Sequence, residues 1–152
     1  MPAADFHREL LARSDRSRTW EILTDVARIA DWVSVVGEVT EVAPLQQYRA
    51  VLADRLGPFR LKADLDVRVP EVEAGSFIRV TAAGEDRQVS SRISVDAVLR
   101  LEPAADERTT MVVVEGHYEV VGRVASMGAG IISQKAQKIL DEFFTRAASE
   151  LG

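Results

Sequence analysis

The feature that most constrains this sequence is a strict alternation of apolar and polar residues between Phe59 and Val69. The apolar members are Phe59, Leu61, Ala63, Leu65, Val67 and Val69, and the polar members are Arg60, Lys62, Asp64, Asp66 and Arg68. Successive side chains of a β-strand point to opposite faces, so the pattern predicts a strand with one buried and one solvent-facing side. Strands of this kind are typical of an antiparallel sheet that is covered on one face only.

Other segments repeat this period of two, and turn residues separate them. We expect strands over residues 4–13, 38–43, 48–56, 59–69, 77–83, 90–102 and 109–121. We expect the connecting turns at Pro44, Gly57-Pro58, Gly75, Gly84-Glu85-Asp86 and residues 103–107. The last six strands follow one another with short connections, which predicts a meander.

Two parts of the chain have helical periodicity instead. Asp15 and Asp25 are each suited to cap a short helix. From Val124 to Leu151 the apolar residues form one broad stripe, which predicts a single amphipathic helix of about eight turns. Its first turns contain Gly128-Ala129-Gly130, and this thin segment is expected either to pack closely on the sheet or to form the wall of a pocket.

The order of these elements predicts an α+β fold. We expect residues 1–152 to form one domain, in which a seven-stranded antiparallel sheet wraps around the long C-terminal helix and two short helices follow the first strand. Only the long helix is large enough to cover the apolar face, and a twisted sheet of this size curls around its cover. The space between helix and sheet is then either filled by side chains or left as a pocket.

Composition excludes several kinds of function. The 152 residues include no cysteine, which excludes disulfides, thiolate metal sites and cysteine nucleophiles. The net charge of −5 argues against a nucleic-acid-binding protein. The sequence shows no secretory signal and no run of about 20 apolar residues, so we expect a cytoplasmic protein.

Three stretches resemble the CoxG family of carbon monoxide dehydrogenase subunits, which has the helix-grip fold of the START and birch-pollen-allergen (SRPBCC) superfamily. They are Trp20-Glu21-Ile22-Leu23-Thr24-Asp25 with Arg28-Ile29-Ala30, then Leu56-Gly57-Pro58-Phe59, then Val120-Val121-Gly122-Arg123-Val124-Ala125-Ser126-Met127-Gly128. Together with the element order, the resemblance covers nearly the whole chain. The chain departs from the family's pattern at Val35-Val36-Gly37, where a proline-glycine pair is usual.

The resemblance implies a non-catalytic accessory protein for a molybdenum-containing carbon monoxide dehydrogenase, linked to enzyme recruitment or to electron delivery at the membrane. It also implies a bound quinone-like or lipid-like molecule and no other cofactor. Many family members carry a further C-terminal segment that contacts the membrane, whereas this chain stops at Gly152. Any membrane association is therefore expected to be peripheral, at the inner face of the cell membrane.

Fourteen residues are candidates for contact with an apolar ligand. Trp32 follows the second helix in a loop and is expected at the mouth of the pocket, while Trp20 is expected in the core. Tyr48 and Tyr118 each carry a hydroxyl that either orients a ligand inside the pocket or lies on its rim. The full set is Trp32, Tyr48, Leu52, Asp54, Leu61, Ala63, Leu65, Val95, Ala97, Tyr118, Val124, Met127, Gly128 and Ile131.

One residue is a candidate for acid-base chemistry. Asp54 shares strand parity with Tyr48 and Leu52, so it lies either in the pocket or, beside the Gly57-Pro58 turn, in solvent. In the pocket it would suit an enzyme of the cyclase or dehydratase kind, which this fold also supports. The sequence places few ionisable groups at inward positions, so we favour ligand binding and assign no catalytic residue. A pure interaction module with a filled core is the third alternative.

The two histidines lie at opposite ends of the chain. His7 and His117 come together if the first and last strands pair. His117 alternates with Glu115 and Glu119, a pattern typical of a solvent-facing strand side, so we assign no metal site. A separate cluster of arginines, at 13, 16 and 18, is interpreted as a solvated surface or as a docking surface for an acidic partner.

Overall fold

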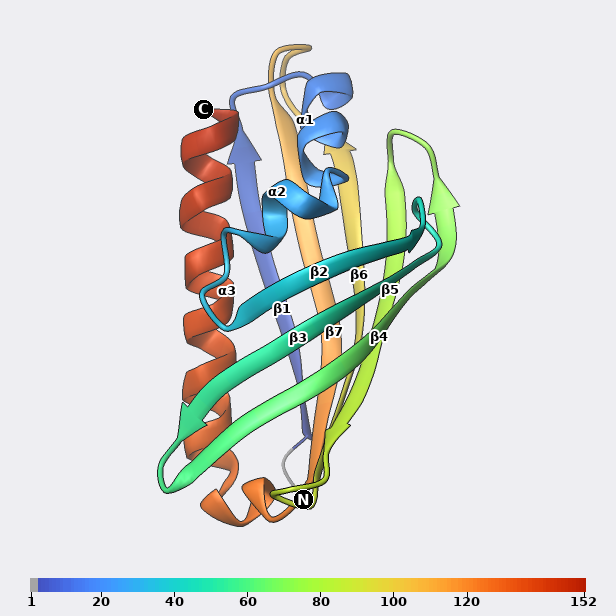
Figure 1. The fold of residues 1–152 in the computed structure, drawn as a ribbon. Helices are drawn as coiled ribbons and strands as arrows, with labels where there is room; N and C mark the ends of the chain where they lie inside the picture. Colours follow the sequence, from blue (N-terminus) through green and yellow to red (C-terminus); the bar gives the residue numbers. More distant parts are fainter. Residues whose placement is uncertain (1–2) are drawn as a thin grey trace.

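One long antiparallel sheet curls against a C-terminal helix in this chain (Figure 1). The structure, a computed structural model, describes residues 3–152. Its elements are β1 (Ala3–Ala12), α1 (Arg16–Leu23), α2 (Val26–Ala30), β2 (Val36–Ala43), β3 (Gln47–Leu56), β4 (Phe59–Glu73), β5 (Phe77–Asp86), β6 (Ser91–Pro103), β7 (Thr110–Gly122), the 3₁₀ helix η1 (Val124–Met127) and α3 (Ala129–Leu151). The strand order is β1-β7-β6-β5-β4-β3-β2 and every neighbouring pair is antiparallel. The predicted α+β helix-grip fold, with its meander of six strands, is confirmed.

The alternation that predicted β4 separates its two faces as expected. Leu61 and Ala63 are buried, while Arg60 and Lys62 are exposed. β3 pairs with β4 along its whole length, which sets Asp54 opposite Leu61 on the same side of the sheet. The inward faces of the two strands therefore form one continuous wall beneath α3.

The sheet bends strongly, because its ladders are interrupted at defined points. β4 and β5 lose register between Arg68 and Glu71, where Pro70 has no amide hydrogen to donate. β2 and β3 have two further register shifts. In Figure 1, β2, β3 and β4 cross in front of β1, β7 and β6 at a steep angle, so the sheet reaches α3 from two directions.

The turn predicted at Gly84-Glu85-Asp86 is wrong. β5 continues to Asp86, and the chain turns over residues 87–90, where Ser90 has a φ of 46°. Gly84 lies inside the strand, and a Cβ at this position would come within 2.3 Å of the Asp64 carbonyl oxygen. A close approach of two backbones, and not a turn, requires this glycine.

The helical parts agree with the prediction at the first two helices and differ at the third. Asp15 and Asp25 cap α1 and α2 by accepting the amide hydrogens of Arg18 and Arg28. The predicted continuous helix from Val124 is wrong, because the chain forms η1 first and then breaks at Gly128, whose φ is 95°. This left-handed conformation favours glycine and lets α3 start in a new direction.

The core between α3 and the sheet consists of two clusters. The closed end, beneath α1 and α2, consists of Ala12, Ile22, Leu23, Trp32, Leu101, Val112, Ala147 and Leu151. The hollow end, beside η1, consists of Leu56, Leu61, Tyr118, Val120, Val124 and Ile132. Both clusters lie between the same helix and the same sheet, and the difference between them locates the candidate site.

Candidate ligand-binding site

An apolar cavity lies at the hollow end, between α3 and the inward face of the sheet. Its volume is about 260 Å³, slightly below the usual range of small-molecule sites. Twenty residues line it: Phe6, Val33, Val35, Val36, Leu52, Asp54, Leu56, Leu61, Leu65, Ala82, Ile93, Val95, Tyr118, Val120, Val124, Ile132, Lys135, Ala136, Ile139 and Leu140. Apart from Asp54, Lys135 and the phenol of Tyr118, every lining side chain is apolar.

An ion pair spans one side of this cavity, from β3 to α3. Lys135 Nζ lies 3.1 Å from Asp54 Oδ2 and 3.3 Å from Oδ1. The Arg55 amide also donates to Asp54 Oδ1 over 2.7 Å. The side chains of Asp54 and Lys135 are 21% and 32% exposed, so the pair is only partly shielded from water. It brings two charged groups to the edge of an otherwise apolar space.

A second polar contact joins α3 to the loop before β2. Glu142 accepts a hydrogen bond from the Ser34 amide at 2.8 Å and another from the Ser34 hydroxyl at 2.7 Å. These two bonds favour the charged carboxylate and lower the pKa of Glu142 from its usual value. Val33 and Val35, on either side of Ser34, line the cavity. The Ser34–Glu142 contact therefore holds the loop that covers one side of the cavity.

Half of the predicted ligand contacts lie on the cavity wall. β3 and β4 contribute Leu52, Asp54, Leu61 and Leu65, and later elements contribute Val95, Tyr118 and Val124. Of the two alternatives left open for Asp54, the structure shows the one in the pocket wall, with Lys135 as its ionic partner. Contact of these seven residues with a ligand stays a prediction.

Trp32 and Tyr48 do not lie at the pocket mouth or inside the cavity. Trp32 is 3% exposed in the closed end and packs against Phe143, with 5.5 Å between ring centroids. Its buried Nε1 has no hydrogen-bond partner among residues 3–152. The Tyr48 hydroxyl accepts the Leu45 amide hydrogen at 2.7 Å, in a turn where Leu45 has a φ of 51°. Tyr48 thus stabilises a turn.

The remaining predicted contacts lie beside the cavity and not on its lining. Ala63 lies between the lining residues Leu61 and Leu65 on the inward face of β4 without lining the cavity itself, and Ala97 lies one inward position beyond Val95 on β6. Met127 packs against Gly57 in the β3–β4 turn. Gly128 and Ile131 are exposed, and nothing lies within 4 Å of a Cβ built on Gly128. Neither alternative for the glycine segment is therefore seen: it does not pack closely on the sheet at Gly128 or Gly130, and residues 128–130 do not line the cavity.

Sequence reasoning missed several lining residues for identifiable reasons. Ile93 has the same parity as Val95 and was recoverable from the strand pattern. Lys135 belongs by periodicity to the polar side of α3, but its long side chain reaches across to Asp54. Val33, Val35 and Val36 lie in and after an irregular loop, whose direction periodicity does not specify.

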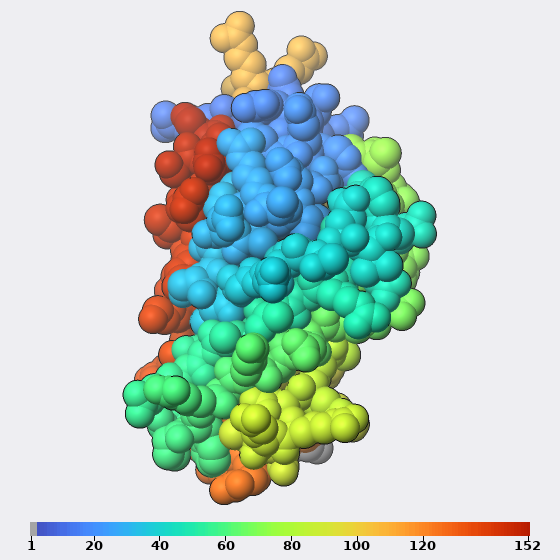
Figure 2. All heavy atoms as spheres, in the orientation of Figure 1, coloured from blue at the N-terminus to red at the C-terminus, as the bar shows by residue number. Residues whose placement is uncertain are grey.

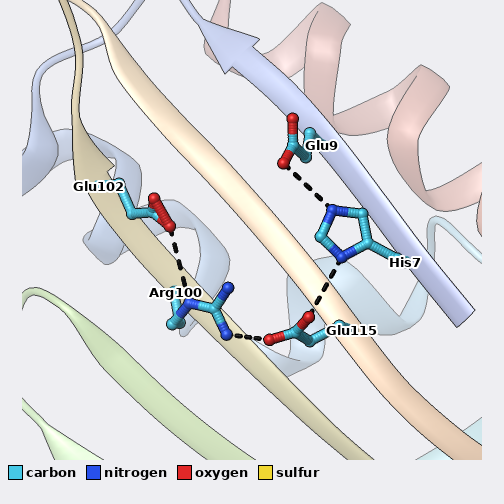
Figure 3. A network of polar contacts seen from close by, with 5 residues as sticks. All are labelled: His7, Glu9, Arg100, Glu102 and Glu115. Carbon is cyan, nitrogen blue, oxygen red and sulfur yellow. Dashed lines mark hydrogen bonds and ion pairs between the residues drawn. The ribbon is translucent and has the colours of Figure 1, made fainter.

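The opposite face of the sheet carries charged networks (Figure 3). β1 pairs with β7, so His7 lies opposite Glu115, and each ring nitrogen of His7 lies 3.1 Å from a carboxylate oxygen, of Glu9 or of Glu115. These contacts, that with Glu9 first, raise the pKa of His7. Arg100 also contacts Glu115, whose pKa it lowers.

His117 forms a separate pair on the same face, 2.7 Å from Asp5. A wide, open groove of about 660 Å³ runs past both histidines and past the Arg79–Asp96 ion pair. Within residues 3–152, no group of three histidine or acidic side chains is arranged to hold a metal ion. The charged groups of this face satisfy one another in open solvent, whereas the cavity is apolar and covered, so the cavity is the better candidate site.

The described part of the chain contains no helix that is both long and apolar enough to cross a membrane.

Solved structures with the same fold come from several bacteria. A conserved protein from Geobacillus kaustophilus superposes with a TM-score of 0.84 at 18% identity, over 97% of this chain and 95% of that chain. A protein from Thermus thermophilus gives a TM-score of 0.72 at 10% identity, covering 97% of each chain. A START superfamily protein from Mycobacterium smegmatis gives 0.71 at 10% identity, over 97% of this chain and 96% of that one. At these identities the likeness establishes the fold.

Sequence comparison identifies the family. No curated protein sequence matches the chain. The CoxG family of carbon monoxide dehydrogenase subunits matches residues 12–152, which include every lining residue except Phe6. Its START-like fold and the sequence resemblance of the helices, the Gly57-Pro58 turn and the β7–η1 passage agree with this match. The chain therefore belongs to the CoxG family of carbon monoxide dehydrogenase subunits.

Proposed function

We propose that this protein binds a small apolar molecule between α3 and the sheet and acts as an accessory protein of a molybdenum-containing carbon monoxide dehydrogenase type enzyme. The observation that carries the proposal is the composition of the cavity wall, in which 17 of 20 side chains are wholly apolar. An apolar cavity that stays empty of side chains gains little from water and favours an apolar occupant. Family membership supports the accessory role.

The proposed ligand class is a quinone or a lipid. A cavity of about 260 Å³ accommodates a ring system or part of an acyl chain, with the rest of a longer molecule projecting from it. Lys135 and Asp54 lie at its edge, where the ammonium can donate to a carbonyl or hydroxyl oxygen of the ligand. We place the protein in the cytoplasm, peripheral to the inner face of the cell membrane, where both ligand classes are available.

Native mass spectrometry of freshly purified protein, with analysis of its organic extract, tests the ligand. We expect a stoichiometric apolar molecule in the wild type. Ala136→Phe puts a ring into the cavity and should remove the adduct, whereas Ala148→Phe places the same ring on the exposed surface of the same helix and should retain it. Equal ligand occupancy in both variants, or no uptake even after incubation with quinone and lipid, would contradict the proposal.

The partner enzyme is tested separately. Immobilised protein should retain a purified carbon monoxide dehydrogenase of the molybdenum type and fail to retain an unrelated molybdenum enzyme. If the immobilised protein does not retain the carbon monoxide dehydrogenase but does bind an apolar ligand, the accessory role is wrong and the ligand-binding role stands.

One observation supports a second function, that of a cyclase or dehydratase type enzyme. Asp54 and Tyr118, the two groups such a reaction would use, line the same cavity. The carboxylate already contacts Lys135 and the Arg55 amide, which favours the binding role. An enzyme would convert an added ligand to a product of changed mass, and Asp54→Asn would stop the conversion. A binding protein returns the ligand unchanged.

A further inference from the structure

Three segments far apart in the sequence meet at one end of the molecule, below the cavity. They are the β3–β4 turn, the β5–β6 turn, and the passage from β7 through η1 into α3 (Figure 1). The Arg123 amide donates to the Ser90 carbonyl at 3.2 Å, and Met127 packs on Gly57. Figure 2 shows the first and third segments exposed at the lower end. These contacts make the three segments one continuous surface.

This surface has a charge opposite to that of the whole chain. Residues 55–60, 87–92 and 122–135 contain none of the 24 acidic residues, but six of the 19 lysines and arginines. We call the five arginines of these segments, with the turns that carry them, the basic end: Arg55, Arg60, Arg87, Arg92 and Arg123. Asp54, Glu85 and Asp86 directly adjoin these segments, and with these three carboxylates set against the six cations the region still carries a net charge of +3, whereas the whole chain carries −5.

The fold does not use most of these charges. Arg55 lies directly opposite Arg60 in the β3–β4 ladder, an arrangement of like charges that disfavours strand pairing. Within residues 3–152, no carboxylate is within ion-pair distance of Arg55, Arg60 or Arg123. Arg87 and Arg92 both approach Glu85, so one carboxylate serves two arginines. A surplus of positive charge therefore remains on this surface.

Apolar groups lie among the arginines. Ile131, in the first turn of α3, is 41% exposed, and Pro58 is exposed at the tip of the β3–β4 turn. The Arg123 guanidinium lies 5.7 Å from the centre of the Phe59 ring. Protruding turns with apolar residues among cations fit a lipid surface, because the apolar groups enter the acyl boundary while the cations stay with the headgroups.

We propose that the basic end docks on a lipid surface that carries anionic headgroups, and that the ligand enters and leaves the cavity there. The docking surface adjoins the cavity, because Leu56, Val124 and Ile132 belong to the same segments and line it. The first part of the proposal stands on charge and exposure alone. The second rests on the proposed binding of a quinone or lipid, which dissolves in membranes and not in water.

Electrostatic attraction to the headgroups sets how much membrane affinity should be lost when arginines of the basic end are replaced. Each arginine near an anionic membrane contributes a factor of roughly five in affinity, so removing three charges weakens binding on the order of 100-fold. The attraction falls off within about 10 Å at 0.1 M salt, so the net negative charge of the distant remainder does not cancel it. Binding should therefore weaken as salt is raised.

Co-flotation of the full chain with vesicles tests docking. Wild type should float with vesicles of equal parts phosphatidylcholine and phosphatidylglycerol and stay behind with phosphatidylcholine alone. The triple variant Arg55→Gln, Arg60→Gln, Arg123→Gln should lose binding on the order of 100-fold. The matched control is Arg13→Gln, Arg16→Gln, Arg18→Gln, which removes the same charge from exposed arginines at the opposite end and should bind like wild type.

Two outcomes would overturn the proposal: no flotation of the wild type, or equal losses in both triple variants. If the wild type does not float but the first triple variant loses its interaction with the partner enzyme, the basic end serves an acidic protein and the lipid assignment is wrong. Ile131→Ser should also weaken flotation several-fold, while Leu11→Ser, at a more exposed site near the opposite end, should not. Ligand occupancy in the triple variants, measured by mass spectrometry, distinguishes failed docking from failed ligand binding.

Discussion

The closed end and the hollow end of the interface share one helix and one sheet but differ in what fills the space between them. At the closed end α1 inserts Ile22 and Leu23, and the loop after α2 inserts Trp32; these side chains are 1%, 4% and 3% exposed. Among residues 3–152, no α-helix other than α3 borders the hollow end, whose wall instead includes Val124 of η1 and the valines at 33, 35 and 36. The two ends therefore differ in role: the closed end stabilises the fold, and the hollow end retains space for a ligand.

Deleting the same side chain at each end should give the largest contrast. Ile22→Ala removes a wholly surrounded side chain and should lower the free energy of unfolding by about 3–5 kcal/mol. Ile132→Ala should cost nearer 2 kcal/mol, because this side chain already borders empty space and forfeits fewer contacts. Urea unfolding of both variants measures the difference. Equal losses would mean that the cavity is filled in solution, or that both ends pack alike.

Enlarging a side chain should again cost more at the closed end than at the hollow end. Ala147 and Ala136 lie eleven residues apart on α3, three turns along the same face, one at each end. Ala147→Leu overpacks the closed end and should cost about 1–3 kcal/mol. Ala136→Leu enters the cavity and should cost less than about 0.5 kcal/mol, or stabilise the protein, while lowering ligand occupancy. Thermal unfolding of the ligand-free variants separates these outcomes, and a larger loss for Ala136→Leu would refute the comparison.

The sequence predicted the sheet side of this comparison better than its helical side. Strand parity places Leu52, Asp54, Leu61 and Leu65 on one wall, because alternation is a local property that survives in the folded chain. The sequence also predicted both Asp-capped helices, because a capping side chain bonds an amide within three residues of itself.

The errors concern features that local pattern does not encode. Trp32 lies in the closed end because Phe143, distant in sequence, meets it there. Gly128 interrupts an apolar stripe that is continuous in the sequence. The break was not predicted, because a positive φ does not change the periodicity of apolar residues. Whether a helix–sheet interface is solid or hollow depends on packing contributed by all of its elements, and no single segment specifies it.

A smaller effect on the free energy of unfolding is expected from removing the Ser34–Glu142 contact, which holds the loop at one side of the hollow end. Ser34 lowers the pKa of Glu142, so the folded state releases this proton more readily than the unfolded chain, whose value is 4.5. The contact therefore stabilises the fold above the unfolded pKa, and this stability is lost as pH falls through the lowered folded pKa. Glu142→Gln should cost below about 1 kcal/mol at neutral pH, since the pair is near the surface.

The pH series supplies the control for this contact. The difference in unfolding free energy between wild type and Glu142→Gln should shrink as pH falls below 4.5. A difference independent of pH would show that the charge of Glu142 does not act through Ser34.

The smallest effect on ligand binding is expected from a substitution on the outer face of the sheet, which should alter neither the closed end nor the hollow end. Glu9 and Glu115 raise the pKa of the exposed His7, so their contribution to stability is fully present below the unfolded value of 6.5. It is lost as pH rises through the raised folded pKa. Titration by NMR should give a pKa above 6.5 in the wild type, and Glu9→Gln should lower it. Ligand occupancy should stay unchanged in this variant, because the network lies across the sheet from the cavity. A change in occupancy would mean that the outer charges, and not inward packing alone, set the difference between the two ends.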